Sequence, residues 1–314
     1  MKSVDELKAV YELPLPELIL HAAQVHRANH DFRDIQRCAL LSIKTGGCPE
    51  DCGYCAQSAR YDTSVRPTPL LSVAEVEERA AQAKRLGATR FCLGAAWRGP
   101  PEGAAFERVL DMVRAVRRLG MEACVTLGML TDKQAERLRD AGLTAYNHNL
   151  DTSRRHYGKI ISTRTYEDRL QTLRAVGRAG IAVCCGGIIG MGETEEDRLL
   201  LLAELSAVDP PPESIPINCL VPVPGTPLEE SPPVDSFELV RLIATARIAF
   251  PRSRVRLSAG RDRMSRELQA LCFLAGANSI FFGEKLLTTP NPSASADAEL
   301  FHALGLPPAV PVEP

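Results

Sequence analysis

Residues 46–57 are Gly46-Gly47-Cys48-Pro49-Glu50-Asp51-Cys52-Gly53-Tyr54-Cys55-Ala56-Gln57, which spaces three cysteines as C-x3-C-x2-C. One short loop with this spacing can turn all three thiolates toward a single centre. The glycines at positions 46, 47 and 53 supply the backbone freedom that such a wrap requires. The preceding apolar residues 39–43 predict a buried strand, so the loop is expected to hang from a strand end.

The thiolates of this loop are expected to bind a metal. Thiolates select iron–sulfur clusters, zinc or Cu(I). A structural zinc site takes four protein ligands, but no further Cys or His follows nearby, and the next histidine is His148. A cubane cluster held by three cysteines keeps one iron free for chemistry. The pattern favours an iron–sulfur site, with zinc as the alternative.

Length, composition and charge narrow the class of protein. The 314 residues form one large domain or two, and that length permits a single α/β barrel. A net charge of −2 argues against nucleic acid as the main partner. No apolar run approaches the ~18 residues that a membrane span needs. The first thirty residues carry four acidic side chains and no signal-peptide pattern, which predicts a cytoplasmic protein.

Ten cysteines are many for a chain of this kind. Disulfide frameworks belong to small secreted proteins, so metal ligation or catalysis is the better interpretation here. The alternative is that free cysteines act as small buried hydrophobes. For Cys38, Cys219 and Cys272 we adopt that alternative.

A repeating pattern follows the cysteine loop: an amphipathic helix, a glycine, then an apolar strand. Five copies have their glycines at positions 87, 120, 142, 180 and 276. Glycine just past a helix end suits a left-handed cap, and Ser72-x-x-Glu75 and Thr131-x-x-Gln134 have the form of capping boxes. Strands alternating with helices predict a parallel sheet covered on both faces.

Eight strands are expected, near residues 38–44, 89–95, 121–127, 144–150, 181–187, 214–221, 253–259 and 278–283. Eight such strands predict an α/β fold of the (β/α)8 TIM-barrel type. A doubly wound open sheet is the rival, but no G-x-G-x-x-G follows the first strand. We expect an N-terminal helical cap over residues 1–36, the barrel over 37–287 and a C-terminal extension, with one short helix and a loose end, over 288–314.

Unusual residues lie on several expected strands. Residues two apart in a strand share a face, and barrel active sites form at the C-terminal strand ends. The residues in question are Arg90, Cys92, Cys124, Cys184 with its neighbour Cys185, and Arg256. An arginine between valine and leucine is costly to bury unless it faces partners. Three cysteines and an arginine converging in one barrel could bind a second metal centre, and buried apolar cysteines remain the alternative.

The fourth expected strand ends in three polar residues at two-residue spacing, Asn147, Asn149 and Asp151. Three polar side chains on one face are poor core material, so ligand contacts are favoured. His148 has the opposite parity and is expected to pack or hydrogen-bond rather than bind a ligand.

The cysteine spacing with an aromatic residue, Tyr54, just before the last cysteine resembles the radical S-adenosylmethionine (SAM) enzymes. From about residue 40 to residue 292, the segments quoted above resemble the biotin synthase family. That resemblance implies a 4Fe–4S cluster on Cys48, Cys52 and Cys55 that cleaves SAM. It also implies a 2Fe–2S cluster that donates sulfur, with four ligands: Cys92, Cys124, Cys184 and Arg256.

Two of these implied ligands need comment. Arginine is an unusual ligand, because its guanidinium carries donors and no acceptor; Arg90, on the same face of its strand as Cys92, is expected to hold Arg256 in place. Cys185 departs from the family pattern, which more often has a small residue there. The choice of Cys184 over Cys185 is therefore the least secure of the cysteine assignments.

The resemblance also implies ligand contacts. Those to SAM fall on Tyr54, Asn149, Asp151, Arg169 and Ile188, and those to the substrate on Asn147, Asn149 and Asn218. For Arg169 the alternative is a solvated helix charge. No catalytic side chain is expected beyond the cluster ligands.

The implied reaction is sulfur insertion into dethiobiotin to form biotin. An electron-donor protein such as flavodoxin and a homodimer are the implied partners. Three alternatives are weighed: another radical SAM enzyme of the hydrogenase-maturation or rearrangement type, a non-catalytic iron–sulfur carrier, and a zinc-stabilised binding protein.

Overall fold

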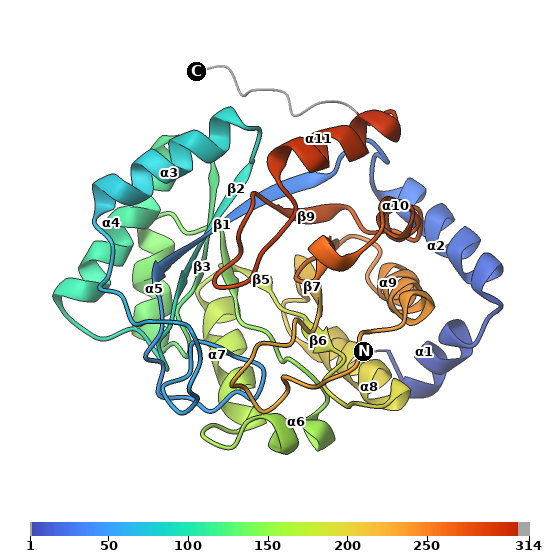
Figure 1. The fold of residues 1–314 in the computed structure, drawn as a ribbon, viewed down its shortest axis with the longest axis horizontal. Coiled ribbons are helices and arrows are strands. Elements are labelled where there is room, and N and C mark those ends of the chain that lie inside the picture. Colours follow the sequence, from blue (N-terminus) through green and yellow to red (C-terminus); the bar gives the residue numbers. More distant parts are fainter. Residues whose placement is uncertain (1, 307–314) are drawn as a thin grey trace.

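The computed structural model describes residues 2–306, and its strands form one closed parallel barrel with helices outside it (Figure 1). All ladders are parallel, and β1 pairs with both β2 and β9. The ring closes where Cys184 of β5 pairs with Ser214 of β7. The strands are β1 Gln36–Lys44, β2 Arg90–Ala95, β3 Glu122–Thr126, β4 Ala145–Asn147, β5 Ala182–Cys184, β6 Gly187–Ile189, β7 Ser214–Cys219, β8 Arg254–Leu257 and β9 Ser279–Phe282.

The predicted (β/α)8 barrel is confirmed, with one local difference. The expected fifth strand is two short strands, β5 and β6, separated by Cys185 and Gly186. A Cβ atom at Gly186 would lie 2.0 Å from the carbonyl oxygen of Pro216, so only glycine fits this approach of the two backbones. Nine strand segments therefore make eight positions around the barrel.

Helices surround the barrel in the predicted alternation. The Ser72 and Thr131 side chains accept hydrogen bonds from the backbone N–H groups of Glu75 and Gln134, which confirms both capping boxes. Gly276 shows why glycine ends a helix here: its φ is +109°, and a Cβ would press against Arg247. The outer helices are α3 Val73–Arg85, α4 Ala104–Arg118, α5 Asp132–Asp140, α6 Arg154–Ile160, α7 Tyr166–Arg178, α8 Glu195–Ala207, α9 Ser236–Ala249 and α10 Arg266–Leu274.

The two N-terminal helices are α1 Val4–Tyr11 and α2 Leu15–Asn29. They pack on the outside of the helix layer, α1 against α8 and α9 and α2 against α9 and α10 (Figure 1). Tyr11 is buried there and its hydroxyl donates to a carboxylate oxygen of Glu238 at 2.6 Å.

The C-terminal part returns to the barrel through helix α11, Ala294–Ala303. Asp297 of this helix forms a buried ion pair with Arg261, which belongs to the short 3-10 helix Arg261–Arg263 after β8. Asn291 donates from its side chain to the carbonyl oxygens of Phe281 and Gly283. The last residues of the expected loose end, 307–314, lie outside the described part.

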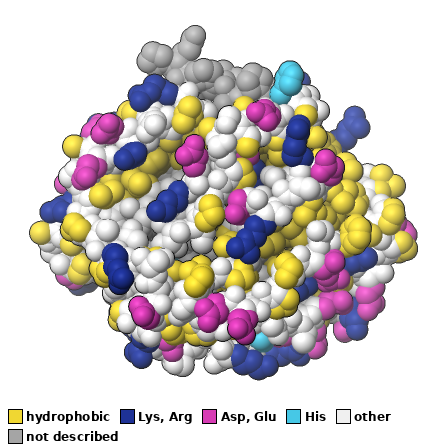
Figure 2. Space-filling model, viewed as in Figure 1, with side chains coloured by type: hydrophobic (Ala, Val, Ile, Leu, Met, Phe, Trp, Pro, Cys, Tyr) yellow, Lys and Arg dark blue, Asp and Glu magenta, His cyan; other side chains and the backbone are white. Residues whose placement is uncertain are grey.

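The surface in Figure 2 intersperses acidic and basic side chains, in keeping with the net charge of −2. No helix within residues 2–306 has both the length and the hydropathy of a membrane-crossing segment.

Replacing Asp297 by alanine should lower the free energy of unfolding by about 3–5 kcal/mol, because the buried Arg261 guanidinium loses its counter-charge. Urea unfolding measures the change. The matched control is Asp132→Ala, which breaks an exposed pair with Arg178 and should cost no more than about 1 kcal/mol. Equal effects of the two substitutions would contradict a structural role for the Arg261–Asp297 pair.

Candidate active site

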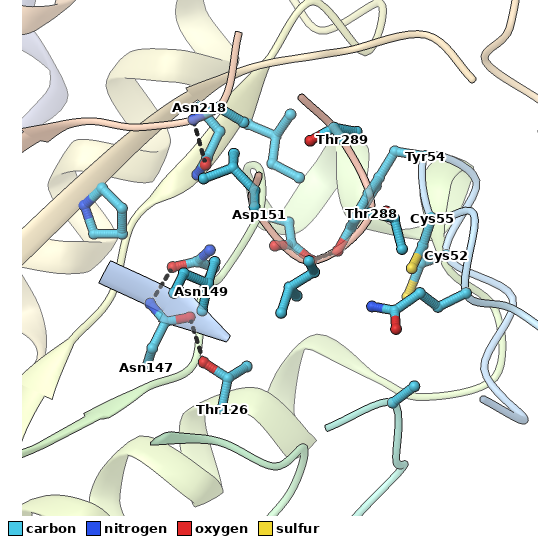
Figure 3. A pocket seen from close by; sticks show the side chains of 18 of the residues that line it. Cys52, Tyr54, Cys55, Thr126, Asn147, Asn149, Asp151, Asn218, Thr288 and Thr289 are labelled. Carbon is cyan, nitrogen blue, oxygen red and sulfur yellow. Dashed lines mark hydrogen bonds between the residues drawn. The ribbon is translucent and has the colours of Figure 1, made fainter. Parts of the chain in front are cut away.

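A cavity of about 310 Å³ opens at the C-terminal end of the barrel. Its wall combines the cysteine loop, the ends of β2 to β4, β6, β7 and β8, and residues 286–289 from the segment after β9. Figure 3 shows Cys52 and Cys55 on one side of this cavity and Asn147, Asn149 and Thr126 on another, with Asp151 between them. The predicted site residues from distant parts of the chain therefore meet in one place.

The loop after β1 turns its three cysteines toward the cavity, as the spacing predicted. The backbone N–H of Cys48 donates to the carbonyl oxygen of Gln57 at 2.9 Å, which closes the loop. Within it, the N–H of Cys55 donates to the carbonyl oxygen of Cys52, also at 2.9 Å. Gly46 begins the turn with a φ of +69°, a conformation that favours glycine.

Glu50 and Asp51, between the first two cysteines, anchor the loop to other parts of the chain. Asp51 accepts hydrogen bonds from the backbone N–H groups of Ser162 at 3.0 Å and Thr163 at 3.1 Å. Glu50 is buried and pairs with Arg98 at 2.7 Å. The sequence analysis did not assign these roles, because the partners are more than forty positions away along the chain.

The loop thiols are buried enough to hold their protons when no metal is bound. Burial, reinforced by the neighbouring Cys52, raises the pKa of the Cys55 thiol to about 12. Binding a metal centre there must therefore release protons. Arg164, another residue missed from the sequence, donates to the Cys52 sulfur at 3.4 Å and places positive charge beside the site.

The arrangement of these thiols indicates whether they can bind a single metal ion or a multi-iron cluster. Among residues 2–306, no three Cys, His, Asp or Glu side chains are arranged to bind one metal ion together. A multi-iron cluster does not require that convergence, because each thiolate binds a different iron atom. The three thiols facing one cavity therefore fit a cluster.

The polar residues at the end of β4 form a connected network on the cavity wall (Figure 3). The Thr126 hydroxyl donates to the Asn147 side-chain oxygen at 3.1 Å, and Asn147 donates to the Asn149 side-chain oxygen at 3.1 Å. The same Asn149 oxygen accepts the backbone N–H of Gly186 at 3.1 Å. These hydrogen bonds hold the side-chain amides of Asn147 and Asn149 in place, and both residues line the cavity.

Asp151 is the charged centre of the wall. It adopts a φ of +67°, uncommon for a residue with a side chain. Its carboxylate accepts a hydrogen bond from the Tyr54 hydroxyl at 2.8 Å and forms an ion pair with Arg169. Burial, together with the Asp151 charge, raises the pKa of Tyr54 well above its usual value, so this phenol remains a donor.

Arg169 is buried, so the alternative of a solvated helix charge is wrong. It projects from α7 and donates to the backbone carbonyl oxygen of Asn149 at 2.6 Å and to the Tyr157 hydroxyl at 2.8 Å. Burial alone would lower its pKa, but the charge of Asp151 raises that pKa well above the usual value.

His148 is buried and packs beside the Tyr146 ring, as expected of a packing residue. Because β4 ends at Asn147, strict alternation fails beyond it, and His148 also lines the cavity. It is buried, its Nε2 has no hydrogen-bond partner among the described residues, and burial lowers its pKa well below the usual value.

Asn218 and Ile188 complete the wall on the opposite side. Asn218 of β7 donates to the carbonyl oxygen of Gly187 at 3.0 Å and accepts the N–H of Ala259 at 3.2 Å. Ile188 of β6 lines the cavity, and its N–H is bonded to the carbonyl oxygen of Asp151 at 2.7 Å.

Deeper in the barrel, Cys92, Cys124 and Cys184 form a second group of thiols. All three are buried, Cys92 is paired with Cys124 in the β2–β3 ladder, and Cys124 and Cys184 are close enough to affect each other's pKa. The Cys184 sulfur also accepts from Asn147 at 3.3 Å and from Arg256 at 3.6 Å. Cys185 instead packs in the apolar core, so the fold brings Cys184 and not its neighbour to this group.

Two polar side chains, Ser279 and Gln36, hold the Arg256 guanidinium in place. Its Nε donates to the Ser279 hydroxyl at 2.9 Å, and its Nη2 lies 3.4 Å from the side-chain oxygen of Gln36. Among residues 2–306, Arg90 forms no hydrogen bond with Arg256; it pairs with Glu122 at 2.7 Å and Glu213 at 3.1 Å. Gln36 donates to the same Glu122 carboxylate at 3.1 Å. Arg90 therefore supports Arg256 only through Glu122 and Gln36.

Cys38 is fully buried, as expected of a small buried residue, and it lies in the same cluster as Cys92 and Cys124. Its thiol also donates to the side-chain oxygen of Gln36 at 3.4 Å. Its backbone is paired with Arg90 in the β1–β2 ladder. Cys272 does lie in the apolar core as expected, whereas Cys219 belongs to that core and also lines the cavity.

Family models match both halves of the chain. Residues 42–205 match the Radical SAM superfamily, and residues 216–307 match the Biotin and Thiamin Synthesis associated domain. The first model alone covers half of the 314 residues.

Curated relatives match nearly the whole chain. The biotin synthase of Methylobacterium sp. (strain 4-46) is 64% identical over 306 residues, which cover 97% of this chain and 92% of that protein. The biotin synthase of Gloeobacter violaceus is 60% identical, covering 98% of this chain and 96% of that protein.

Solved structures share the fold. Methylornithine synthase matches with a TM-score of 0.82 at 20% identity, over 98% of this chain and 94% of that one. The hydrogenase maturase HydG matches with a TM-score of 0.81 at 17% identity, over 96% of this chain and 70% of that one. At these identities the likeness concerns the fold alone.

Proposed function

The chain belongs to the biotin synthase family of radical SAM enzymes, and from this premise we propose that its cavity is where dethiobiotin receives sulfur to become biotin. One observation carries the proposal: a single cavity is lined by the loop thiols at its mouth and, in its floor, by Cys92 and Cys124 of the deeper group. A non-catalytic iron–sulfur carrier has no need of the amide network that lies between them.

The mouth site suits the 4Fe–4S cluster and the SAM that the family implies. We assign Cys48, Cys52 and Cys55 as its ligands. A cluster held by these thiols would supply the electron for reductive cleavage of SAM, which is the chemistry that starts hydrogen removal from the substrate. The loop contributes three thiols, and Glu50 and Asp51 fix its position through their contacts outside the loop.

The wall between the two thiol groups suits SAM. Asp151 and the side-chain oxygen of Asn149 offer acceptors for an ammonium group or ribose hydroxyls. Arg169 holds the Asp151 carboxylate through an ion pair, and its positive charge favours a second carboxylate nearby. Tyr54 and Ile188 supply apolar surface beside them.

The deeper part suits the substrate and the sulfur donor. Asn147 and Asn218 present amides, which match the donors and acceptors of a urea-like ring. Cys92, Cys124, Cys184 and Arg256 surround the floor, where we propose the 2Fe–2S cluster. A cluster held there would supply the sulfur for insertion into dethiobiotin. The protein contributes placement and the exclusion of water.

The remaining expectations stay predictions. They are the electron-donor protein such as flavodoxin, the homodimer and the cytoplasmic location. The hydrogenase-maturation alternative shares the fold, but the curated relatives at 60% and 64% identity support biotin formation instead.

Anaerobically reconstituted protein given dethiobiotin, SAM and a chemical reductant should produce biotin and 5′-deoxyadenosine, both measurable by mass spectrometry. Cys92→Ala should still cleave SAM but should form less than about a hundredth of the biotin, because the floor site loses a ligand while the mouth site is intact. Cys185→Ala is the matched control and should form biotin normally, since this thiol packs in the apolar core. Undiminished biotin formation by Cys92→Ala would refute the floor assignment.

Asp151→Asn should weaken SAM binding about 10- to 100-fold, as expected for losing charge-assisted hydrogen bonds. Asparagine tolerates the positive φ at this position, so the backbone is kept. Equilibrium dialysis with labelled SAM measures the change. Asn218→Ala serves as the comparison: it should raise the KM for dethiobiotin and leave SAM affinity within about twofold. Unchanged SAM binding by Asp151→Asn would remove Asp151 from the SAM site.

A further inference from the structure

Arg164 lies beside the loop cysteines, and neither the sequence patterns nor the proposed function gives it a role. Its Nη2 donates to the sulfur of Cys52 at 3.4 Å. Its side chain is only 9% exposed, and the residue lines the cavity. Because Cys52 is one of the proposed ligands of the mouth cluster, a donor at its sulfur would act on the cluster itself.

The chain fixes the position of Arg164 relative to the cysteine loop. Asp51, the residue before Cys52, accepts hydrogen bonds from the backbone N–H groups of Ser162 at 3.0 Å and Thr163 at 3.1 Å. In return, the backbone N–H of Asp51 donates to the Thr163 hydroxyl at 3.2 Å. These reciprocal bonds hold the two residues before Arg164 against the loop, so the guanidinium is carried to the Cys52 sulfur by its own backbone.

The positive charge of Arg164 is balanced only in part by carboxylates. Within residues 2–306 its one ion pair with a carboxylate is to Glu50, with 3.7 Å between Arg164 Nε and the Glu50 oxygen. Glu50 lies closer to a second arginine, Arg98, at 2.7 Å. A buried cation needs negative charge nearby, and metal-bound thiolates of the loop would provide it.

The guanidinium of Arg164 also has a hydrogen-bond donor to spare. Its Nε is buried and forms no hydrogen bond in the part of the chain that the structure describes. By contrast, the three nitrogens of Arg169 all donate to protein groups, namely the Tyr157 hydroxyl, the Asn149 carbonyl oxygen and the Asp151 carboxylate. Buried polar groups are normally hydrogen-bonded, so the spare Arg164 donor indicates that this side chain serves a group bound in the cavity.

We propose that Arg164 sets the reduction potential of the mouth cluster by donating a hydrogen bond to the sulfur of its ligand Cys52. The inference rests on the proposed function, which places a 4Fe–4S cluster on Cys48, Cys52 and Cys55. Hydrogen bonds to ligand sulfurs and nearby charge are among the factors that set the potential of such a cluster. On reduction one electron enters from an external reductant, and no bond forms or breaks. Arg164 stabilises the added negative charge, so the cluster is easier to reduce.

The test measures the midpoint potential of the mouth cluster by reductive titration followed by electron paramagnetic resonance (EPR). Arg164→Met should lower the equilibrium constant for one-electron reduction about tenfold, a shift of about 59 mV to more negative potential. Arg164→Lys should shift the potential less in the same direction, because one ammonium cannot replace the planar fork. The matched control is Arg98→Met, which also removes a Glu50 partner but no donor to a sulfur, and it should change the equilibrium constant less than about twofold.

An unchanged midpoint potential in Arg164→Met would overturn the inference, and so would an equal shift in Arg98→Met. If Arg164→Met does not retain its cluster, Arg164→Lys decides alone: a more negative potential supports the inference, and an unchanged potential refutes it. A tenfold loss of SAM affinity in Arg164→Met at unchanged potential, measured by equilibrium dialysis, would make Arg164 a cofactor-binding residue instead. Wild-type protein that gives no 4Fe–4S EPR signal on reduction would refute the function on which the inference rests.

Discussion

The register of the parallel barrel is the constraint on which the whole site depends. It sets Cys92 directly opposite Cys124 and Asn147 opposite Cys184, so that thiols from separate strands meet inside the barrel. A slip of one residue in any of these strands would turn its side chains to the other face. The break between β5 and β6 belongs to the same constraint, because Gly186 admits the backbone of β7 at a distance that no side chain allows.

The two groups of thiols lie at different depths in one cavity. The mouth thiols come from a loop whose shape is fixed by contacts to the segment after α6, whereas the floor thiols come from the strands themselves. Asn147 connects the two levels, since it bonds to Asn149 on the wall and to the Cys184 sulfur below. A substrate held at this level would lie between the two thiol groups, which is what sulfur insertion requires of the protein.

Much of the fold could be predicted from the sequence, because helix caps and apolar strands are local signals that repeat along the chain. The loop cysteines, the choice of three strand cysteines and the asparagines at the end of β4 followed from spacing and resemblance. What failed depended on tertiary context. The break at Gly186 depends on Pro216 from another strand. His148 and Cys38 are buried as expected, but the cavity beside His148 and the Ser279 hydroxyl beside Cys38 come from other parts of the chain.

The central claim is that two inorganic clusters of different kinds occupy one barrel. Mössbauer spectroscopy of the iron-57-reconstituted wild-type protein tests it most directly, because the method separates iron environments by cluster type. The account predicts two components in a ratio of about two to one, from a 4Fe–4S and a 2Fe–2S cluster. A single 4Fe–4S component in fully reconstituted protein that still forms biotin would contradict it.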